Sequence, residues 1–343
     1  MAQRNLPPRL PARSPEDYTV GWLCALHCEL VSASCMLDNR HEDHECSNPS
    51  DRNVYTFGDI KGHNIVIASM TAGHSGLVSA QRLIQPLNQS FPNMTLHLFV
   101  GIGGGIPRNP SPGHPSQDIH LGDVVVGGPK DPAAPAVVQY DHIRHHQAER
   151  RELIGHLNKP SFALLNALTP METNCTFGEV NFTAHLRRLT PVERFRYPGE
   201  NKDILYRAGF KHAGQPLSGC ASCDPSEVIR RTQRQQDEFV WHQGTILSGD
   251  QLMMDGEYRD ILSAENHNAI CFEMEAAGVT DDTNCLMIRG IADYADSHKN
   301  QDWQWWAAGR AAAFARELLR TIRPVVVASM RSNEGGKHRL STP

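Results

Sequence analysis

The chain has 343 residues, of which 40% are hydrophobic and 21% charged, and 33 Lys and Arg residues against 38 Asp and Glu residues give a formal net charge of -5. This composition is typical of a globular protein and can form one large core or two smaller ones. No basic run and no apolar stretch of membrane-spanning length occurs, so we expect neither nucleic-acid nor membrane partners. The 9 cysteines lack the pattern of a secreted disulfide framework. We therefore expect a reducing, cytoplasmic setting.

The first part of the chain predicts strands alternating with helices. Residues 1–16 are rich in Pro and Arg without periodicity, which predicts a disordered arm. A buried strand is predicted over 18–26, and apolar residues at helical spacing predict a helix over 27–37. Residues 54–60 and 64–70 predict a hairpin.

Glycine-rich turns are predicted where the next strands end. The turn TAGHSG over 71–76 begins a helix predicted over 77–87. A strand over 96–102 runs into a turn at 103–105, and a short strand follows at 124–126. This alternation favours a mostly parallel sheet with helices packed on it.

The second part of the chain is less regular. A helix interrupted by Pro160 is predicted over 153–168, whereas 171–240 is a polar, Pro-broken insert without clear periodicity. Strand-like sequence returns at 244–250, and one apolar face predicts a helix over 303–322. We expect a single catalytic domain over 17–325 that includes the insert, followed by a disordered tail over 326–343.

Acidic side chains stand at several of the predicted strand ends. The segment CFEMEAAGVTDDTNCLMIRGIADYADS carries Glu273, Glu275 and Asp293, and Glu29 follows the first strand. The carboxyl ends of strands are where α/β sheets bind ligands. Carboxylates accept hydrogen bonds from sugar hydroxyls, and they transfer protons when burial raises their pKa. These residues therefore predict a sugar-containing substrate whose leaving group needs a proton.

Seven motifs occur between about Val20 and His298, in the order VGWLCALHCEL, VGIGGGI, LGDVVV, VVQYD, GTILSGDQLMMDG, FEMEAAG and LMIRGIADYADSHKN. Together they resemble the nucleoside phosphorylase/nucleosidase superfamily, and most of all the fungal domains of this kind found at the N-terminus of immune-receptor-like proteins. The resemblance implies an α/β fold with a central mixed, partly barrel-like sheet flanked by helices. It also implies no metal, no organic cofactor, a small purine nucleoside as ligand, and a homodimer or higher homo-oligomer.

The resemblance implies a role for each acid. Glu275 would bind the ribose 2′- and 3′-hydroxyls with Met274 packed against the sugar, Asp293 would protonate or hydrogen-bond N7 of the leaving purine, and Glu29 would activate water. Each of these acids has a simpler reading as a helix cap or as an acid favoured by a helix dipole. Glu273 is a further candidate for substrate binding, although a structural acid is the alternative.

The remaining predicted site residues surround the sugar and the base. The resemblance implies that Gly103 and Gly104 line both, and that Leu252 and Met253 lie beside the base, where nucleosidases often carry an aromatic residue. His74 in the GHSG turn faces either the sugar or solvent.

The nucleophile predicted from the sequence is water. Phosphorylases of this superfamily bind phosphate through arginines, but the first loop reads ALHCE and the residue before Val100 is Phe99. A carboxylate at Glu29 would repel phosphate by ~1 kcal/mol or more. We therefore expect a purine nucleosidase, and Asp rather than Asn at 293 favours an adenine-type nucleoside.

Other functions stay open at this point. Phosphorolysis is one alternative, and a non-catalytic nucleoside-sensing or interaction domain is another. A nucleotide or ATP nucleosidase is a third, if basic residues of the insert recognise 5′-phosphates; these are Arg187, Arg188, Arg230 and Arg231.

Two further features have more than one reading. Cys220 and Cys223, with His212 before them and Asp224 after them, have the residue types of a zinc site, but a single CxxC pair is a weak signal and we expect no metal. Arg289 lies within a predicted strand, where it is either a buried ion-pair partner or a ligand contact.

Overall fold

The computed structural model describes residues 8–43, 48–71, 73–108, 118–146, 151–154, 157–215, 217–280 and 283–324. The helices are α1 (His27–Met36), α2 (Leu77–Ser90), α3 (Phe162–Thr176), α4 (Phe182–Leu186), α5 (Gly256–Glu265), α6 (Ala276–Thr280) and α7 (Gln304–Thr321). The strands are β1 (Arg9–Leu10), β2 (Val20–Cys24), β3 (Asn39–His41), β4 (Tyr55–Ile60), β5 (His63–Ser69), β6 (Leu96–Gly105), β7 (Val124–Gly127), β8 (Val137–Gln139), β9 (Ile143–His145), β10 (Arg151–Leu153), β11 (Trp241–Gly244), β12 (Ile246–Ser248), β13 (Cys271–Glu273) and β14 (Leu286–Asp293).

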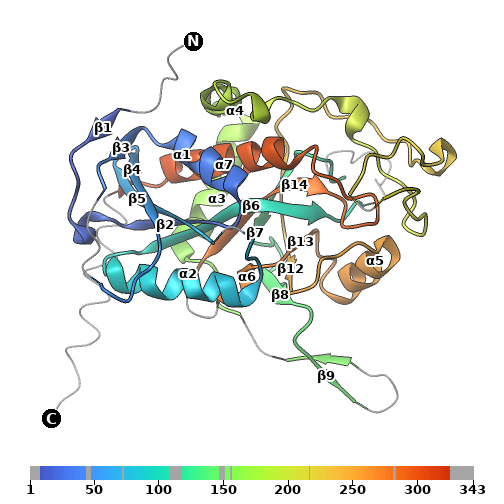
Figure 1. The fold of residues 1–343 in the computed structure, drawn as a ribbon, viewed down its shortest axis with the longest axis horizontal. Coiled ribbons are helices and arrows are strands. Elements are labelled where there is room, and N and C mark those ends of the chain that lie inside the picture. Colours follow the sequence, from blue (N-terminus) through green and yellow to red (C-terminus); the bar gives the residue numbers. More distant parts are fainter. Residues whose placement is uncertain are drawn as a thin grey trace.

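Twelve of these strands form one mixed sheet that branches at β6. One path runs β1-β3-β4-β5-β2-β6-β13-β12-β8, and β6 also pairs with β14, which leads to β7 and β11. The central pairs of β2 with β5 and β6, and of β6 with β14, are parallel, whereas β4 and β5 form the predicted antiparallel hairpin. The predicted α/β fold with a mixed sheet flanked by helices is confirmed. The hairpin β9–β10 is a separate two-stranded sheet that extends from the body (Figure 1).

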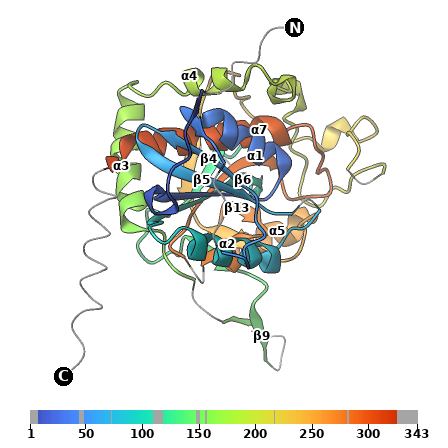
Figure 2. The same cartoon turned by 60° about the vertical axis from the view of Figure 1, so that its left-hand side comes forward.

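Helices cover both faces of the sheet. Helices α1, α3 and α7 lie on one face and α2 and α6 on the other, as Figures 1 and 2 show from two directions. Successive residues of a strand point to opposite faces. Accordingly Val20, Trp22 and Cys24 of β2 pack in the core on the α1 and α7 side, whereas Leu23 packs in the core on the α2 side. A strand buried on both faces is continuously apolar, which explains the sequence VGWLC.

The close approach of α7 to the sheet fixes the position of β14. The helix is rich in alanine, and these small side chains are fully buried along it. A Cβ atom on Gly290 of β14 would lie 2.0 Å from the carbonyl oxygen of Ala307. Only glycine therefore fits at this position of the strand that ends at Asp293.

Several elements differ from their prediction. Gly103–Gly105 belong to β6 and pair with β13 and β14, so they form a strand and not a turn. The helix predicted over 153–168 begins later, at Phe162 after Ser161, and continues through Pro170 to Thr176. Leu153 lies in β10 instead. The sequence also gave no indication of α5.

The two chain ends were predicted to be disordered. Within the N-terminal segment, Arg9–Leu10 form β1, which pairs in parallel with β3, and Pro15–Asp17 form a 3-10 helix. The prediction of a disordered arm is thus wrong for 8–16. Residues 1–7 and 325–343, which include the predicted tail, lie outside the described residues. Among the described helices, none has both the length and the apolar character needed to cross a membrane.

Candidate active site

A cavity of about 230 Å³ at the ends of β6, β13 and β14 contains the three predicted acids, Glu29, Glu275 and Asp293. They come from positions far apart in the sequence, and the structure brings all three together. Other predicted residues that line this cavity are Gly103, Gly104, Leu252, Met253, Glu273 and Met274. His74 is exposed and is not among its lining residues, whereas the neighbouring Ser75 is.

Glu29 lies in the first turn of α1 and is buried. One of its oxygens, Oε2, accepts hydrogen bonds from the N–H groups of Ala25 (2.7 Å) and Leu26 (3.0 Å), and Oε1 accepts one from Ile102 (2.9 Å). Burial raises the pKa of Glu29, although Arg289 and these N–H groups oppose the shift. The result is a fixed carboxylate that is more basic than an ordinary glutamate.

Arg289 is fully buried on β14 and lies among carboxylates. Its Nη2 atom is 2.5 Å from Oε2 of Glu273 and 3.8 Å from Oε2 of Glu275, and its guanidinium group lies 4.5 Å from the ring centre of Phe99. Burial acts against its charge, but Glu273, Glu275 and Glu29 raise the pKa of Arg289 overall. Of the two alternatives from the sequence, the buried ion-pair partner is confirmed.

Glu273 is occupied by contacts within the protein. Besides its ion pair with Arg289, its oxygens accept hydrogen bonds from the N–H groups of Glu275 and Ala276 at the start of α6. Its side chain is fully buried. The structure thus favours the alternative of a structural acid over the predicted substrate contact.

Glu275 differs because its oxygens have weaker partners. Oε1 accepts a long hydrogen bond of 3.5 Å from the N–H group of Gly76. Burial, and then the charge of Glu273, raise the pKa of Glu275 to about 7, whereas Arg289 acts to lower it. Gly76 has a φ of 87°, and a Cβ atom there would lie 2.3 Å from Oδ1 of Asp250, so the turn next to Glu275 requires glycine.

Asp293 forms an ion pair that the sequence did not reveal. Its Oδ1 atom accepts a hydrogen bond from the N–H group of Ala295 (2.9 Å), and its Oδ2 atom lies 2.6 Å from Nζ of Lys299. Lys299 also lines the cavity. It lies six residues after Asp293 within the motif ADYADSHKN, so the sequence contained the residue. The sequence did not show that the loop folds back and brings Lys299 to Asp293. A Cβ atom on Gly104 would lie 2.9 Å from Oδ1 of Asp293, so this glycine makes room for the carboxylate.

An aromatic residue that the sequence analysis also missed lines the cavity. The prediction noted that Leu252 and Met253 stand where nucleosidases often carry an aromatic residue. Phe272 of β13 lines the same cavity and packs edge-on against Tyr140, with ring centres 5.3 Å apart. It is the first residue of the motif FEMEAAG, and no role was predicted for it. Leu252 is half exposed and Met253 is buried.

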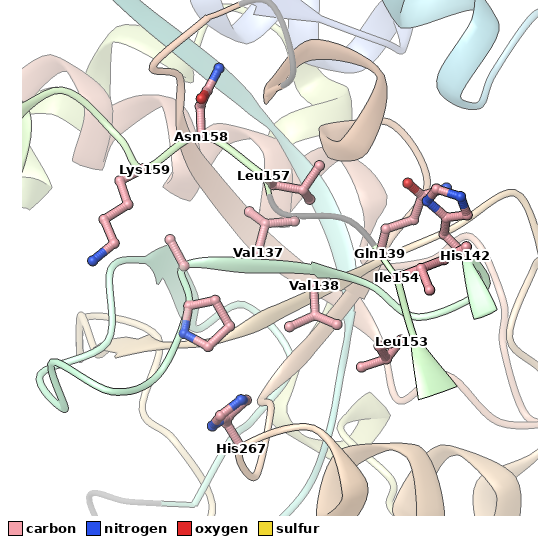
Figure 3. Close-up of a pocket in the computed structure, with 12 residues that line it drawn as sticks. Val137, Val138, Gln139, His142, Leu153, Ile154, Leu157, Asn158, Lys159 and His267 are labelled. Carbon is pink, nitrogen blue, oxygen red and sulfur yellow. The ribbon is translucent and has the colours of Figure 1, made fainter. Parts of the chain in front are cut away.

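A second cavity of about 560 Å³ lies beside the edge strand β8 and the hairpin β9–β10. Figure 3 shows Val137, Val138, Leu153 and Leu157 around it. It is larger than the first, but its lining residues include no carboxylate. Of these two cavities, the smaller one is therefore the one lined by carboxylates.

The basic residues of the insert do not reach the first cavity. None of Arg187, Arg188, Arg230 and Arg231 is among its lining residues. Arg188 donates hydrogen bonds to backbone oxygens at the end of α1, and Arg231 forms ion pairs with Asp118 (3.1 Å) and Asp203 (3.2 Å). The structure thus gives these two arginines partners within the protein.

Comparisons with known proteins found relatives that match most of this chain. No family model matches the chain. A nucleotide-binding leucine-rich repeat (NLR)-like protein of the fungus Hyaloscypha variabilis is 36% identical over 318 residues, which cover 92% of this chain but only 30% of that protein. The 5′-methylthioadenosine/S-adenosylhomocysteine nucleosidase of Mycobacterium bovis is 24% identical over 317 residues, or 90% of this chain and 98% of the relative.

A solved structure has the same fold. The 5′-methylthioadenosine/S-adenosylhomocysteine nucleosidase of Neisseria meningitidis, in complex with methylthio-immucillin-A, superposes with a TM-score of 0.52 and 16% identity, covering 88% of this chain and 99% of that one. The chain therefore has the fold of the nucleoside phosphorylase/nucleosidase superfamily, as its motifs predicted.

Proposed function

We propose that this chain hydrolyses the N-glycosidic bond of an adenine-type purine nucleoside and releases the free base and ribose. The observation that carries the proposal is that Glu29, Glu275 and Asp293 line one cavity. The nucleosidase among the curated relatives and the superposed nucleosidase structure support the same reaction class.

At the sugar end, Glu275 accepts hydrogen bonds from the ribose hydroxyls. Its oxygens have only long contacts with the protein, so they are available to a ligand. As the bond to the base breaks, positive charge builds on the ribosyl group, and hydrogen bonds to an anionic acceptor strengthen. Glu273 and Arg289 act on this step indirectly. Glu273 positions the backbone next to Glu275, and Arg289 places its positive charge there.

At the base end, a proton passes to N7 through Asp293, and Lys299, whose ammonium group pairs with that carboxylate, supplies it, so that the purine leaves as a neutral molecule. The ammonium group of Lys299, 2.6 Å from Oδ2 of Asp293, places a second hydrogen-bond donor at this end of the cavity. A 6-aminopurine is the base that we assign, from the aspartate at position 293 and the adenine-nucleoside chemistry in the names of the relatives.

The nucleophile is a water molecule that gives its proton to Glu29. Arg289, whose charge acts on Glu29, is already paired with Glu273 and close to Glu275. Lys299, the cationic side chain among the lining residues, is paired with Asp293. A phosphate dianion would thus meet carboxylates and no unpaired cation among the residues that line the cavity, whereas neutral water incurs no repulsion.

The test is base release from adenosine, inosine, 5′-methylthioadenosine and ATP in phosphate-free buffer, followed by chromatography. The proposal predicts free adenine from adenosine or 5′-methylthioadenosine, little hypoxanthine from inosine, and a strong loss of activity in Glu275→Gln. If adenine were released from ATP and from none of the nucleosides, the substrate class would be nucleotides instead. Nucleoside binding without release from any substrate would contradict the proposal and favour a sensing domain.

A further inference from the structure

Three metal-ligating side chains meet in the insert, away from the acids of the cavity. The ligand atoms of His212, Cys220 and Cys223 all lie within 4.8 Å of one another. Both cysteines are free thiols. The N–H group of Cys223 donates to the carbonyl oxygen of Cys220 at 3.1 Å, so the CxxC segment forms a tight turn that points both thiols the same way.

The imidazole of His212 has a ring nitrogen that is available to a ligand. Its Nε2 atom is buried and has no hydrogen-bond partner among the described residues. Leaving a buried polar atom unpaired costs about 1–3 kcal/mol, and such atoms call for a missing partner. The backbone N–H group of His212 donates to Oγ of Ser297 at 3.0 Å, which anchors the residue to the loop after β14.

A second histidine lies next to this cluster. The ring of His298 stacks on Tyr206, with centres 4.1 Å apart, and its centre is 5.5 Å from that of His212. Within the described residues, neither ring nitrogen of His298 makes a hydrogen bond, although both are buried. Asp224, which the sequence suggested as a possible ligand, instead accepts hydrogen bonds from Ser226 and is not part of the cluster.

We propose that His212, Cys220 and Cys223 bind a zinc ion, with the fourth position open to His298 or water. Two thiolates and an imidazole are a ligand set that zinc prefers, and tetrahedral zinc places sulfur and nitrogen ligands about 3.3–3.8 Å apart, so small side-chain rotations complete the site. This inference is independent of the proposed hydrolysis, and it replaces the expectation from the sequence that the chain binds no metal.

The protons balance as follows. Without a metal, Cys220 and Cys223 are both free cysteines. Zinc binding converts both thiols into thiolates and releases two protons to the solvent, while His212 binds as the neutral imidazole.

The site would stabilise a segment that has little other regular structure. Between residues 203 and 229, the described chain has one 3-10 helix at Pro225–Glu227 and one isolated bridge from Tyr206 to Val228. Small regions that lack regular pairing are often stabilised by a metal. Through Ser297 the site also connects to the loop that carries Lys299.

Metal analysis of the 343-residue chain tests the proposal. The chain is expressed in zinc-supplemented medium, purified without chelator and measured by elemental mass spectrometry. We expect about one zinc per chain in the wild type and in the control Cys175→Ser, which changes a thiol of α3 outside the cluster, and a loss of most of the metal in Cys220→Ser/Cys223→Ser. An unchanged zinc content in the double variant would overturn the proposal.

A second measurement needs no variant and does not depend on folding of a mutant. Alkylation followed by peptide mapping should show Cys220 and Cys223 protected in the zinc-bound protein and reactive after treatment with a strong chelator, with Cys175 unaffected. The chelator should also lower Tm. Equal reactivity with and without zinc, or an intact mass that reveals a Cys220–Cys223 disulfide, would contradict a metal site.

Discussion

The cavity at the sheet edge and the His212–Cys220–Cys223 cluster differ in what positions their side chains. In the cavity, strands and helix starts fix the acids. Backbone N–H groups hold the carboxylate of Glu29, with N to Oε distances of 2.7–3.0 Å. In the insert, a loop with little regular structure carries the ligands, and they approach one another without such a scaffold. The difference suggests that the cavity is built before any ligand binds, whereas the insert depends on its ligand.

The largest effect is expected at the base end of the cavity. Asp293→Asn should lower kcat by about 10²–10⁴-fold, the usual contribution of a general acid, while nucleoside affinity changes little. Steady-state kinetics and equilibrium binding measure the two effects. Asp302→Asn is the matched control, because Asp302 is half exposed and pairs with Lys202. Full activity in Asp293→Asn would show that Asp293 is not the acid of this mechanism.

The buried ion pair of the cavity should dominate its stability. Arg289→Met leaves Glu273 buried without its cation, which typically costs about 3–5 kcal/mol, and urea unfolding measures this loss. The control is Lys130→Met, which breaks an exposed pair with Glu172 and should cost about 0–1 kcal/mol. Equal losses in the two variants would mean that the network around Arg289 does not stabilise the fold.

A smaller effect tests how closely Asp293 is positioned. Gly104→Ala introduces a Cβ atom 2.9 Å from both Oδ1 of Asp293 and Cβ of Ala295, so the carboxylate must move. Displacements of this size typically lower kcat by about 10–100-fold. An unchanged rate, with an unchanged Tm, would show that the position of Asp293 is less restricted than the structure indicates.

Over the single unit from pH 7 to pH 6, the smallest effect is expected from pH. Because the pKa of Glu275 is raised to about 7, its ionised fraction falls as the pH drops below that value. The carboxylate is the form that accepts hydrogen bonds from the ribose, so kcat/KM should fall up to about tenfold per pH unit below pH 7. A profile that stays flat down to pH 5 would contradict the role of Glu275 as an anionic acceptor.

The same comparison explains what the sequence could predict. Buried strands are continuously apolar and end in recognisable motifs, so β2, β6, β13 and β14 and the three acids were predicted close to their observed positions. Lys299 and Phe272 were missed because their contribution depends on how a loop and a strand face the cavity. His74 was predicted in a ligand-facing turn, but the turn exposes it and brings Ser75 to the cavity.

The insert was predictable only in fragments. Its helices are short, since α4 has 5 residues and each 3-10 helix has 3, and Pro170, just before the insert, lies inside α3, where a proline usually argues against a helix. The spacing of Cys220 and Cys223 was visible, but the sequence could not show that His212 lies next to them. The expected homo-oligomer stays a prediction, because the structure contains one chain.

Water as the attacking group at the cavity is the central feature of the proposed reaction. The most direct test is the initial rate with the best nucleoside substrate as a function of phosphate concentration, with identification of the sugar product. We predict full activity without phosphate, no increase when phosphate is added, and free ribose as the product. A rate that requires phosphate and yields ribose 1-phosphate would contradict the account.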